Sequence, residues 1–232
     1  MDFVRCEAAR RLEHVEPEEQ AQERCCFDDW VDSWERKAAR HDTVNAVTAS
    51  LLKAITALGV SGRTVLDVGC GIGDLAIGAV AAGATSARGF DLSPKAIDRA
   101  RALARTRGVD DRTTFEVGDG SKLDLPSADI VAINRVVCCY PDAEGILDRT
   151  LAAAGSVFAI SAPISSGATG VFNRVHNAIW NMVYRIREKH YGGLQTFIHD
   201  VERIDARIRA AGFRLTHHER RRVVWDLAVY AR

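Results

Sequence analysis

The chain has 232 residues, 47% of them apolar, and its 31 basic and 31 acidic side chains give a formal net charge of zero. This length predicts one or two domains, and this apolar content supports a packed core, so a wholly disordered chain is excluded. The balanced charge disfavours nonspecific attraction to nucleic acid or anionic lipid, although it leaves room for a local patch.

The sequence shows no targeting or membrane-spanning segment. Residues 1–7 lack the apolar core of a secretory signal. The longest uncharged apolar run, Leu75 to Ala84, is far shorter than a membrane-spanning helix. We therefore expect a cytoplasmic protein without stable membrane insertion, present as a monomer or a homodimer.

The six cysteines lie at positions 6, 25, 26, 70, 138 and 139. This spacing matches neither a zinc site nor the disulfide framework of a small secreted domain. We expect free, mostly buried thiols and no metal site, with a reactive thiol as the alternative.

The amino-terminal region divides into an arm and a helix. The first 24 residues hold seven acidic and four basic side chains with little apolar periodicity, which is typical of a weakly structured arm. From Asp42 onward apolar residues recur at helical intervals up to Leu58. Asp42 or Thr43 suits the N-cap of this helix, and Gly59 suits its end.

Residues 64–160 alternate short apolar strands with longer helices. Ser93 can cap one of these helices, and Pro94 suits its first position. The expected strands are 64–68, 87–90, 113–117, 130–134 and 156–160, and the expected helices are 74–82, 93–106 and 143–153. Such alternation predicts a mostly parallel sheet, doubly wound and covered by helices on both faces.

The carboxyl-terminal third departs from this alternation. Residues 161–199 are too long for a simple connection, and the helical spacing of apolar residues from Val171 to Ile186, which Trp180 and Tyr184 extend, predicts a lid helix packed on the amino-terminal helices. A last helix, 201–211, precedes two strands, 213–217 and 223–230. Because the connection between them is short, the final strand is expected to be antiparallel to the others. The basic run His217 to Arg222 is expected to be a solvated turn.

A glycine-rich turn follows the first strand. Asp67 precedes Gly69, Gly71 and Gly73 in a G-x-G-x-G pattern, which differs from the G-x-G-x-x-G of dinucleotide-binding domains. Glycines at this place allow close approach of the backbone to a ligand at the carboxyl ends of the strands. Asp91 ends the second strand, at a spacing suited to accepting hydrogen bonds from both hydroxyls of a ribose.

These motifs resemble the first cofactor-binding motifs of class I S-adenosylmethionine-dependent methyltransferases. The resemblance covers residues 60–232 and implies a Rossmann-like seven-stranded sheet and S-adenosylmethionine as cofactor. It implies that the loop backbone cradles the methionine part, that Asp119 accepts from the adenine amine, and that Asn134 lines the space around the methyl group. The run 136–142 and, more faintly, Trp34 and 42–45 are similar to the magnesium-protoporphyrin O-methyltransferase subgroup, whose substrate is not carried over. The full set of expected cofactor-binding residues is Asp67, Gly69, Cys70, Gly71, Gly73, Asp91, Leu92, Asp119, Gly120 and Asn134.

Methyl transfer is an in-line displacement that depends mainly on alignment and exclusion of water, so a base is needed only if the acceptor must lose a proton. The candidates for such a base are Tyr140, His176 and His199. Trp30, Trp34, Trp180 and Tyr184 could form an aromatic wall for an acceptor, although core packing is the commoner role.

The function expected from the sequence is methyl transfer to O, N or C of a small, partly apolar or aromatic metabolite. Residues 1–58 would form an arm and cap, and residues 59–232 the S-adenosylmethionine-binding domain, with a helical lid over about 161–199. A methyltransferase acting on RNA or protein and a noncatalytic cofactor-binding protein remain open as alternatives. A nicotinamide-dependent oxidoreductase is disfavoured by the glycine pattern, and no nucleic-acid partner is expected.

Overall fold

The computed structural model describes residues 27–28, 31, 45–187, 194–221 and 224–232. The predicted amino-terminal arm, Trp30 and Trp34 lie outside these residues. The described elements are α4 (Ala46–Ala57), β1 (Thr64–Val68), α5 (Asp74–Ala81), β2 (Ser86–Asp91), α6 (Pro94–Thr106), β3 (Thr113–Val117), β4 (Ala128–Asn134), a 3-10 helix (Val137–Cys139), α7 (Ala143–Ala153), β5 (Ala154–Pro163), α8 (Gly167–Ile186), α10 (Val201–Ala210), β6 (Arg214–Arg221) and β7 (Trp225–Ala231).

The strands form one seven-stranded sheet in the order β3-β2-β1-β4-β5-β7-β6. β7 lies between β5 and β6 and is antiparallel to both, whereas the pairs among β1 to β5 are all parallel. The strand order reverses between β1 and β4, which is the switch point where doubly wound domains bind ligands. The predicted doubly wound fold with an antiparallel last strand is confirmed.

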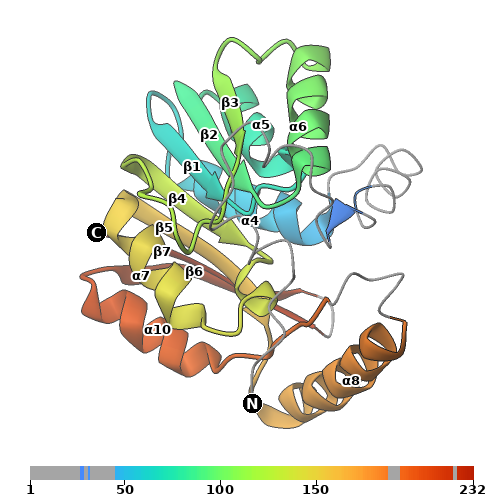
Figure 1. The fold of residues 1–232 in the computed structure, drawn as a ribbon. Helices are drawn as coiled ribbons and strands as arrows, with labels where there is room; N and C mark the ends of the chain where they lie inside the picture. Colours follow the sequence, from blue (N-terminus) through green and yellow to red (C-terminus); the bar gives the residue numbers. More distant parts are fainter. Residues whose placement is uncertain (1–26, 29–30, 32–44, 188–193, 222–223) are drawn as a thin grey trace.

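Helices cover both faces of this sheet (Figure 1). On one face α4, α5 and α6 pack on alternate strand residues, among them Val65, Ile130 and Val229. On the other face α7 and α10 pack on the intervening residues, among them Leu66, Val131 and Phe158. Successive strand residues thus serve two separate cores, the first core under α4, α5 and α6 and the second core under α7 and α10. This explains the continuous apolar character of the strands.

The first residues of α6 and α4 show how side chains cap these helices. The Ser93 hydroxyl accepts from the backbone N–H of Ala96, and Pro94 is the first helical residue of α6, as predicted. For α4 the predicted N-cap is wrong: the Asn45 side chain accepts from Val47 N–H, and the helix begins at Ala46. Asn is as effective an N-cap as Asp, so an apolar period alone does not choose between candidate caps.

The predicted lid contains one long helix, α8, which lies apart from the other helices in Figure 1. β5 continues to Pro163, so the lid segment starts later than residue 161. The prediction that α8 packs on the amino-terminal helices concerns, apart from α4, residues outside the described ones. Among the helices that the structure describes, none has both the length and the apolar character needed to cross a membrane.

The basic run His217 to Arg222 is not the predicted turn. Its residues up to Arg221 belong to β6, which pairs with β7 as far as Arg221 opposite Trp225. β6 is an edge strand, and charged side chains are well tolerated there because one edge of the strand faces solvent. Asp226 contacts both His218 and Arg220, so part of this positive charge is paired within the hairpin.

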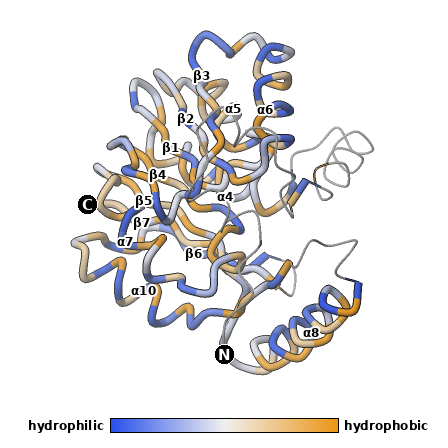
Figure 2. Tube along the Cα trace, in the orientation of Figure 1, coloured by the Kyte–Doolittle hydropathy of each residue, from blue (hydrophilic) through white to orange (hydrophobic). Residues whose placement is uncertain are grey.

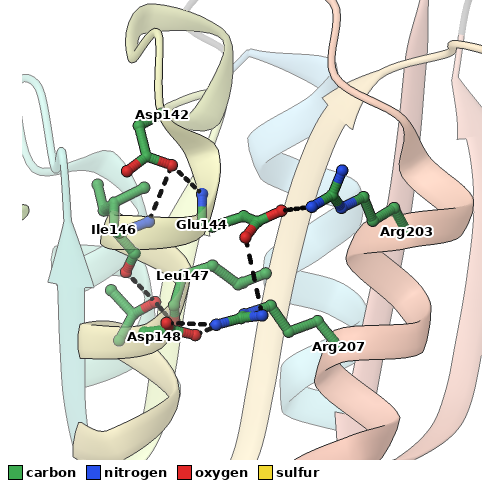
Figure 3. A network of polar contacts seen from close by, with 9 residues as sticks. Asp142, Glu144, Ile146, Leu147, Asp148, Arg203 and Arg207 are labelled. Atoms are coloured by element: carbon green, nitrogen blue, oxygen red, sulfur yellow. Dashed lines mark hydrogen bonds and ion pairs between the residues drawn. The ribbon is translucent and has the colours of Figure 1, made fainter.

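Ion pairs join α7 to α10 across the surface of the second core. Figure 3 shows Arg207 between Asp148 and Glu144, with Arg207 Nε 2.6 Å from Asp148 Oδ1. Arg203 contacts Glu144 on the same edge. Asp142 caps α7 through the N–H groups of Glu144 and Gly145.

Candidate functional site

The glycine-rich turn between β1 and α5 has an unusual backbone. Gly69, Gly71 and Gly73 all have positive φ, at 74°, 54° and 82°. A Cβ at Gly69 would lie 2.2 Å from Val136 Cγ2, and one at Gly73 would lie 2.8 Å from Phe115 Cζ. Both conformation and space therefore require glycine at these two positions. The turn is held against β2, because the N–H groups of Gly69 and Cys70 both donate to Phe90 O.

Asp67, on β1 just before this turn, is almost fully buried, with 1% of its surface exposed. Its Oδ1 has no hydrogen-bond partner among the described residues. Burial, followed by the charges of Asp91 and Asp74, raises the pKa of Asp67 to about 7. A buried carboxylate with a free oxygen is costly unless a ligand or partner satisfies it.

Asp91, at the end of β2, faces the same turn. Its Oδ2 accepts from Gly71 N–H at 2.8 Å and its Oδ1 accepts from Ser93 N–H at 2.9 Å. Burial raises the pKa of Asp91, and the two backbone donors oppose that shift. Leu92 follows Asp91 and is half-buried. Asp28, from the amino-terminal region, contacts the Ser93 hydroxyl.

Asp119 and Gly120 follow β3. Asp119 Oδ1 accepts from the N–H and hydroxyl of Ser121 and, at 3.0 Å, from the Tyr140 hydroxyl. Burial and the neighbouring Asp119 raise the pKa of Tyr140 well above its ordinary value. A Cβ at Gly120 would lie 2.3 Å from Val68 Cγ1, so the backbone passes directly against the end of β1.

Asn134 ends β4, where its side-chain amide is fixed from both sides. Asn134 Nδ2 donates to the Thr48 hydroxyl on α4 at 2.8 Å, and Oδ1 accepts from the Ser161 hydroxyl on β5 at 2.7 Å. Ser161 Oγ also accepts from Arg135 N–H. Arg135 is the one non-glycine residue with positive φ, at 63°, among the residues the structure describes, and its buried Nε has no hydrogen-bond partner there.

The structure brings two of the three candidate bases close to this edge of the sheet. His199 Nε2 lies 2.9 Å from the backbone oxygen of Tyr140. A carbonyl oxygen only accepts, so Nε2 carries the proton. In the neutral ring Nδ1 then has the lone pair that can accept a proton. His176, by contrast, is exposed on α8, where it accepts from the Trp180 indole N–H.

Several residues that hold this site were not singled out from the sequence. Thr48 and Ser161 orient Asn134, and Asp28 joins the group beside Asp91 through Ser93. Their positions depend on contacts between distant segments, which leave no local spacing pattern. A weak sequence signal does exist for Arg135. It directly follows Asn134, the candidate residue at the end of the strand beside the switch point.

The described thiols fit the packing role expected of them. Cys70 and Cys138 are buried and Cys139 is half-buried, and all three are free. Cys70 lies within the glycine-rich turn, and burial raises its pKa well above the ordinary value.

The carboxyl ends of β1 to β4 thus present carboxylates and an amide around a glycine turn. Asp67, Asp74, Asp91 and Asp119 make this edge acidic, which suits a cationic ligand. S-adenosylmethionine carries a sulfonium and an ammonium group, so the residues present fit it. The strand order, the turn and the strand-end residues define the architecture of class I methyltransferases, whose methyl donor is S-adenosylmethionine.

Comparison with known proteins agrees with this assignment. Residues 60–189 match the family model described as a methyltransferase domain, and the chain belongs to that family. Ribosomal protein L11 methyltransferase of Yersinia pseudotuberculosis serotype IB is 34% identical over 125 residues, which cover 53% of this chain and 42% of the relative. The match therefore spans about two fifths of that curated relative.

Solved structures share the fold at lower identity. Magnesium protoporphyrin IX methyltransferase from Synechocystis PCC 6803, solved with bound S-adenosylhomocysteine, has a TM-score of 0.67 at 20% identity, covering 89% of this chain and 96% of the other. An O-methyltransferase family 2 protein from Planctomyces limnophilus, solved with apigenin, has a TM-score of 0.63 at 17% identity, covering 88% and 62%. The likeness extends over most of the chain and concerns its fold.

Proposed function

We propose that this chain transfers the methyl group of S-adenosylmethionine to O, N or C of a small, partly apolar or aromatic metabolite by in-line displacement. The observation that carries the proposal is the buried, unpartnered Oδ1 of Asp67 beside the glycine turn and Asp91. When bound, S-adenosylmethionine supplies an electrophilic methyl group on a positively charged sulfur. The chain supplies binding, alignment and exclusion of water, which account for much of such a rate enhancement.

Each strand end has a distinct part in the proposed cofactor site. The turn Gly69–Gly73, including Cys70, would hold the methionine part, with the Asp67 carboxylate close to its cationic groups. Asp91 would accept from the ribose hydroxyls, since each carboxylate oxygen retains a lone pair beyond its backbone bond. Leu92, Asp119 and Gly120 would surround the adenine, and Asn134 would line the space around the methyl group.

The acceptor side is proposed to lie beside Asn134. Val136 and Cys138 follow Asn134 along the chain and are buried, and Phe197 N–H donates to Cys138 O, so we assign these apolar residues to the acceptor side. Of the candidate bases, Tyr140 is poorly suited to lose its proton because its pKa is raised, so we assign it to orienting Asp119. His199 is the better candidate for the base, because its Nε2 is used by the Tyr140 carbonyl oxygen and its Nδ1 has a lone pair that can accept a proton. His176 stays a candidate only if α8 moves.

The proposal includes the domain division and the location of the protein. Residues 59–232 would form the cofactor-binding domain, with residues 1–58 as arm and cap. α4 within that cap already adds Val47, Leu51 and Ile55 to the first core. A cytoplasmic location is proposed, as expected for a relative of proteins that are named as methylating a ribosomal protein.

A protein acceptor is the second candidate, and one observation favours it: the curated relatives are ribosomal protein L11 methyltransferases. The shared region covers less than half of those proteins. The cofactor half of a methyltransferase can be shared while the acceptor-binding parts differ. Against an RNA acceptor stands the zero net charge of the chain, which provides no long-range attraction to nucleic acid.

Calorimetry with S-adenosylhomocysteine tests the cofactor site. Asp91→Ala removes both acceptors for the ribose and is expected to weaken binding about tenfold or more, since hydrogen bonds to charged groups contribute about 1.5–3 kcal/mol. Asp111→Ala, at an exposed acid after α6, is the matched control and should bind like the wild type. Equal affinity of the Asp91 variant and the wild type would remove Asp91 from the site.

A transfer assay with S-adenosylmethionine labelled in its methyl group identifies the acceptor class. Panels of small phenols, amines and carboxylic acids are compared with ribosomal protein L11 under the same conditions. Labelling of a small acceptor supports the proposal, whereas labelling of L11 alone supports the protein-acceptor alternative. Tight cofactor binding with no transfer to any acceptor points to a noncatalytic binding protein.

A further inference from the structure

One face of α8 is apolar and directed away from the protein. Its exposed fractions run from 40% for Trp180 to 74% for Ile186. Among the described residues, every exposed large apolar side chain except Leu215 lies on this helix. We call these seven residues the outer α8 face: Val171, Phe172, Val175, Ile179, Trp180, Met182 and Ile186. Figure 2 shows the apolar residues recurring along α8, which stands apart from the sheet.

The opposite face of α8 is polar and holds the helix to the protein. Asn173 Nδ2 donates to the backbone oxygens of Ile164 and Val224. Asn177 and Asn181, at successive four-residue intervals, both donate to Thr196 O, and the Thr196 hydroxyl donates to Asn177 Oδ1. An ordinary surface helix packs its apolar face on the core and exposes its polar face. α8 is inverted, and specific hydrogen bonds fix that orientation.

The charges on α8 are all of one sign. Residues 167–187 contain Arg174, Arg185 and Arg187 but no Asp or Glu, and all three arginines are exposed. At 100° per residue, Arg174 and Arg185 flank one side of the outer α8 face, and Arg187 lies at its carboxyl-terminal end, directly after Ile186. A chain with zero net charge therefore carries a local cationic border along one side and at one end of the outer α8 face.

An aromatic row runs along one edge of the outer α8 face. The rings of Phe172, His176, Trp180 and Tyr184 follow one another at centroid distances of 5.8–6.0 Å. Trp180 combines a large apolar ring with an N–H group that donates to His176. Such amphipathic rings favour the boundary between water and lipid.

We propose that the outer α8 face docks on an anionic lipid bilayer, with α8 lying in the plane of the interface. An exposed apolar face bordered by cations and containing Trp and Phe is the pattern of interfacial helices. The arginines would meet anionic headgroups while the apolar side chains enter the acyl boundary. Symmetric pairing with a second copy through this face is disfavoured, because it would bring cationic borders together. The inference does not depend on which reaction the domain catalyses.

Vesicle flotation of the full chain tests the proposal. The chain is expected to float with vesicles of phosphatidylcholine mixed with phosphatidylglycerol, to bind vesicles of phosphatidylcholine alone more weakly, and to dissociate as salt rises. The double variant Ile179→Asp/Met182→Asp should abolish flotation. Leu215→Asp, at the exposed apolar residue on β6, is the matched control and should float like the wild type.

The cationic border is tested separately. Arg174→Glu/Arg185→Glu should lower affinity for the anionic vesicles about tenfold or more, whereas Arg105→Glu/Arg214→Glu, which makes the same charge change at exposed sites elsewhere, should have a smaller effect. Circular dichroism and thermal unfolding confirm that each variant is folded. These sites are exposed, so loss of flotation in a folded variant reports the surface itself.

Three outcomes would overturn the proposal. The first is that wild-type protein fails to bind anionic vesicles, or that both α8 variants bind as the wild type does. The second is a dimer in sedimentation that Ile179→Asp/Met182→Asp dissociates, which would make a second copy the occupant. The third is binding of equal strength to vesicles of phosphatidylcholine alone that salt does not weaken, which would show that anionic headgroups are not what the arginines meet.

Discussion

Asp67 is a carboxylic acid placed where its ionisation is unfavourable. Its burial and the charges of Asp91 and Asp74 raise its pKa from 3.8 to about 7. In the unfolded chain the same group ionises near its ordinary pKa, so between about pH 4 and pH 7 the folded state binds more protons than the unfolded state. Stability therefore falls as pH rises across this range, and the full cost is present above pH 7.

Asp67→Asn removes this titration while keeping the shape of the side chain. We expect the free energy of unfolding of the variant, relative to the wild type, to increase from pH 4 to pH 8, since each unit of pKa shift corresponds to about 1.4 kcal/mol. Urea unfolding at several pH values measures the free energy of unfolding of both proteins. The contributions of the other titrating groups cancel when the wild-type value is subtracted from that of the variant. A difference that stays constant with pH would mean that Asp67 is ionised at pH 5 in the folded protein.

Arg135 is held in a left-handed conformation at the end of β4. A side chain with a Cβ is strained there by about 1–2 kcal/mol, whereas glycine is not. Both Arg135→Gly and Arg135→Ala lose the contact with Trp225, so that loss cancels in their comparison. Arg135→Gly should therefore be more stable than Arg135→Ala by about 1 kcal/mol in urea unfolding. Arg105, in the last turn of α6, provides the control, because the opposite order is expected there. In a helix Arg105→Ala should be more stable than Arg105→Gly. Equal stability of the two Arg135 variants would contradict backbone strain.

At the scale of elements, periodicity predicts where the helices and strands are but not always which way they face. β1, β3 and α7 have the predicted bounds, because apolar runs and turn residues mark both ends. The same kind of apolar period predicts a helix at α8, and the structure confirms it. Its orientation could not be predicted, because it depends on Asn173, Asn177 and Asn181 reaching carbonyl oxygens of distant segments.

α10 shows which interactions hold a helix on the sheet. Ile208 is fully buried in the second core, whereas the Arg207–Asp148 pair of Figure 3 lies at the surface. Ile208→Ala should lower the free energy of unfolding by about 2–5 kcal/mol through lost burial and a cavity. Arg207→Gln should have a much smaller effect, and high salt should remove it. A larger loss for Arg207→Gln than for Ile208→Ala would show that ion pairs hold α10.

At the scale of the whole molecule, the strand-end positions of Asp91, Asp119 and Asn134 were predictable because parallel strands bring their carboxyl ends to one edge. The contacts that orient them were not, since Thr48, Ser161 and Asp28 come from segments far away in the chain. Zero net charge likewise hides the cations of α8, because a sum over the chain contains no information about which charges share a surface.

The alternation of strand residues between two cores has a consequence for unfolding. Ile97 on α6 and Ile146 on α7 are both fully buried, on opposite faces of the sheet. Each Ile→Val substitution should cost about 0.5–1.5 kcal/mol. Because the sheet separates the two sites, the costs should add within about 0.5 kcal/mol in the double variant.

Each of these variants should also shift one common transition, since neither core can lose its packing while the shared strands stay in place. Tryptophan fluorescence and far-UV circular dichroism, followed through urea unfolding, should give the same midpoint for the wild type and for every variant. Two separated transitions, with Ile97→Val moving one and Ile146→Val the other, would show that the helices of each face unfold independently of the sheet between them.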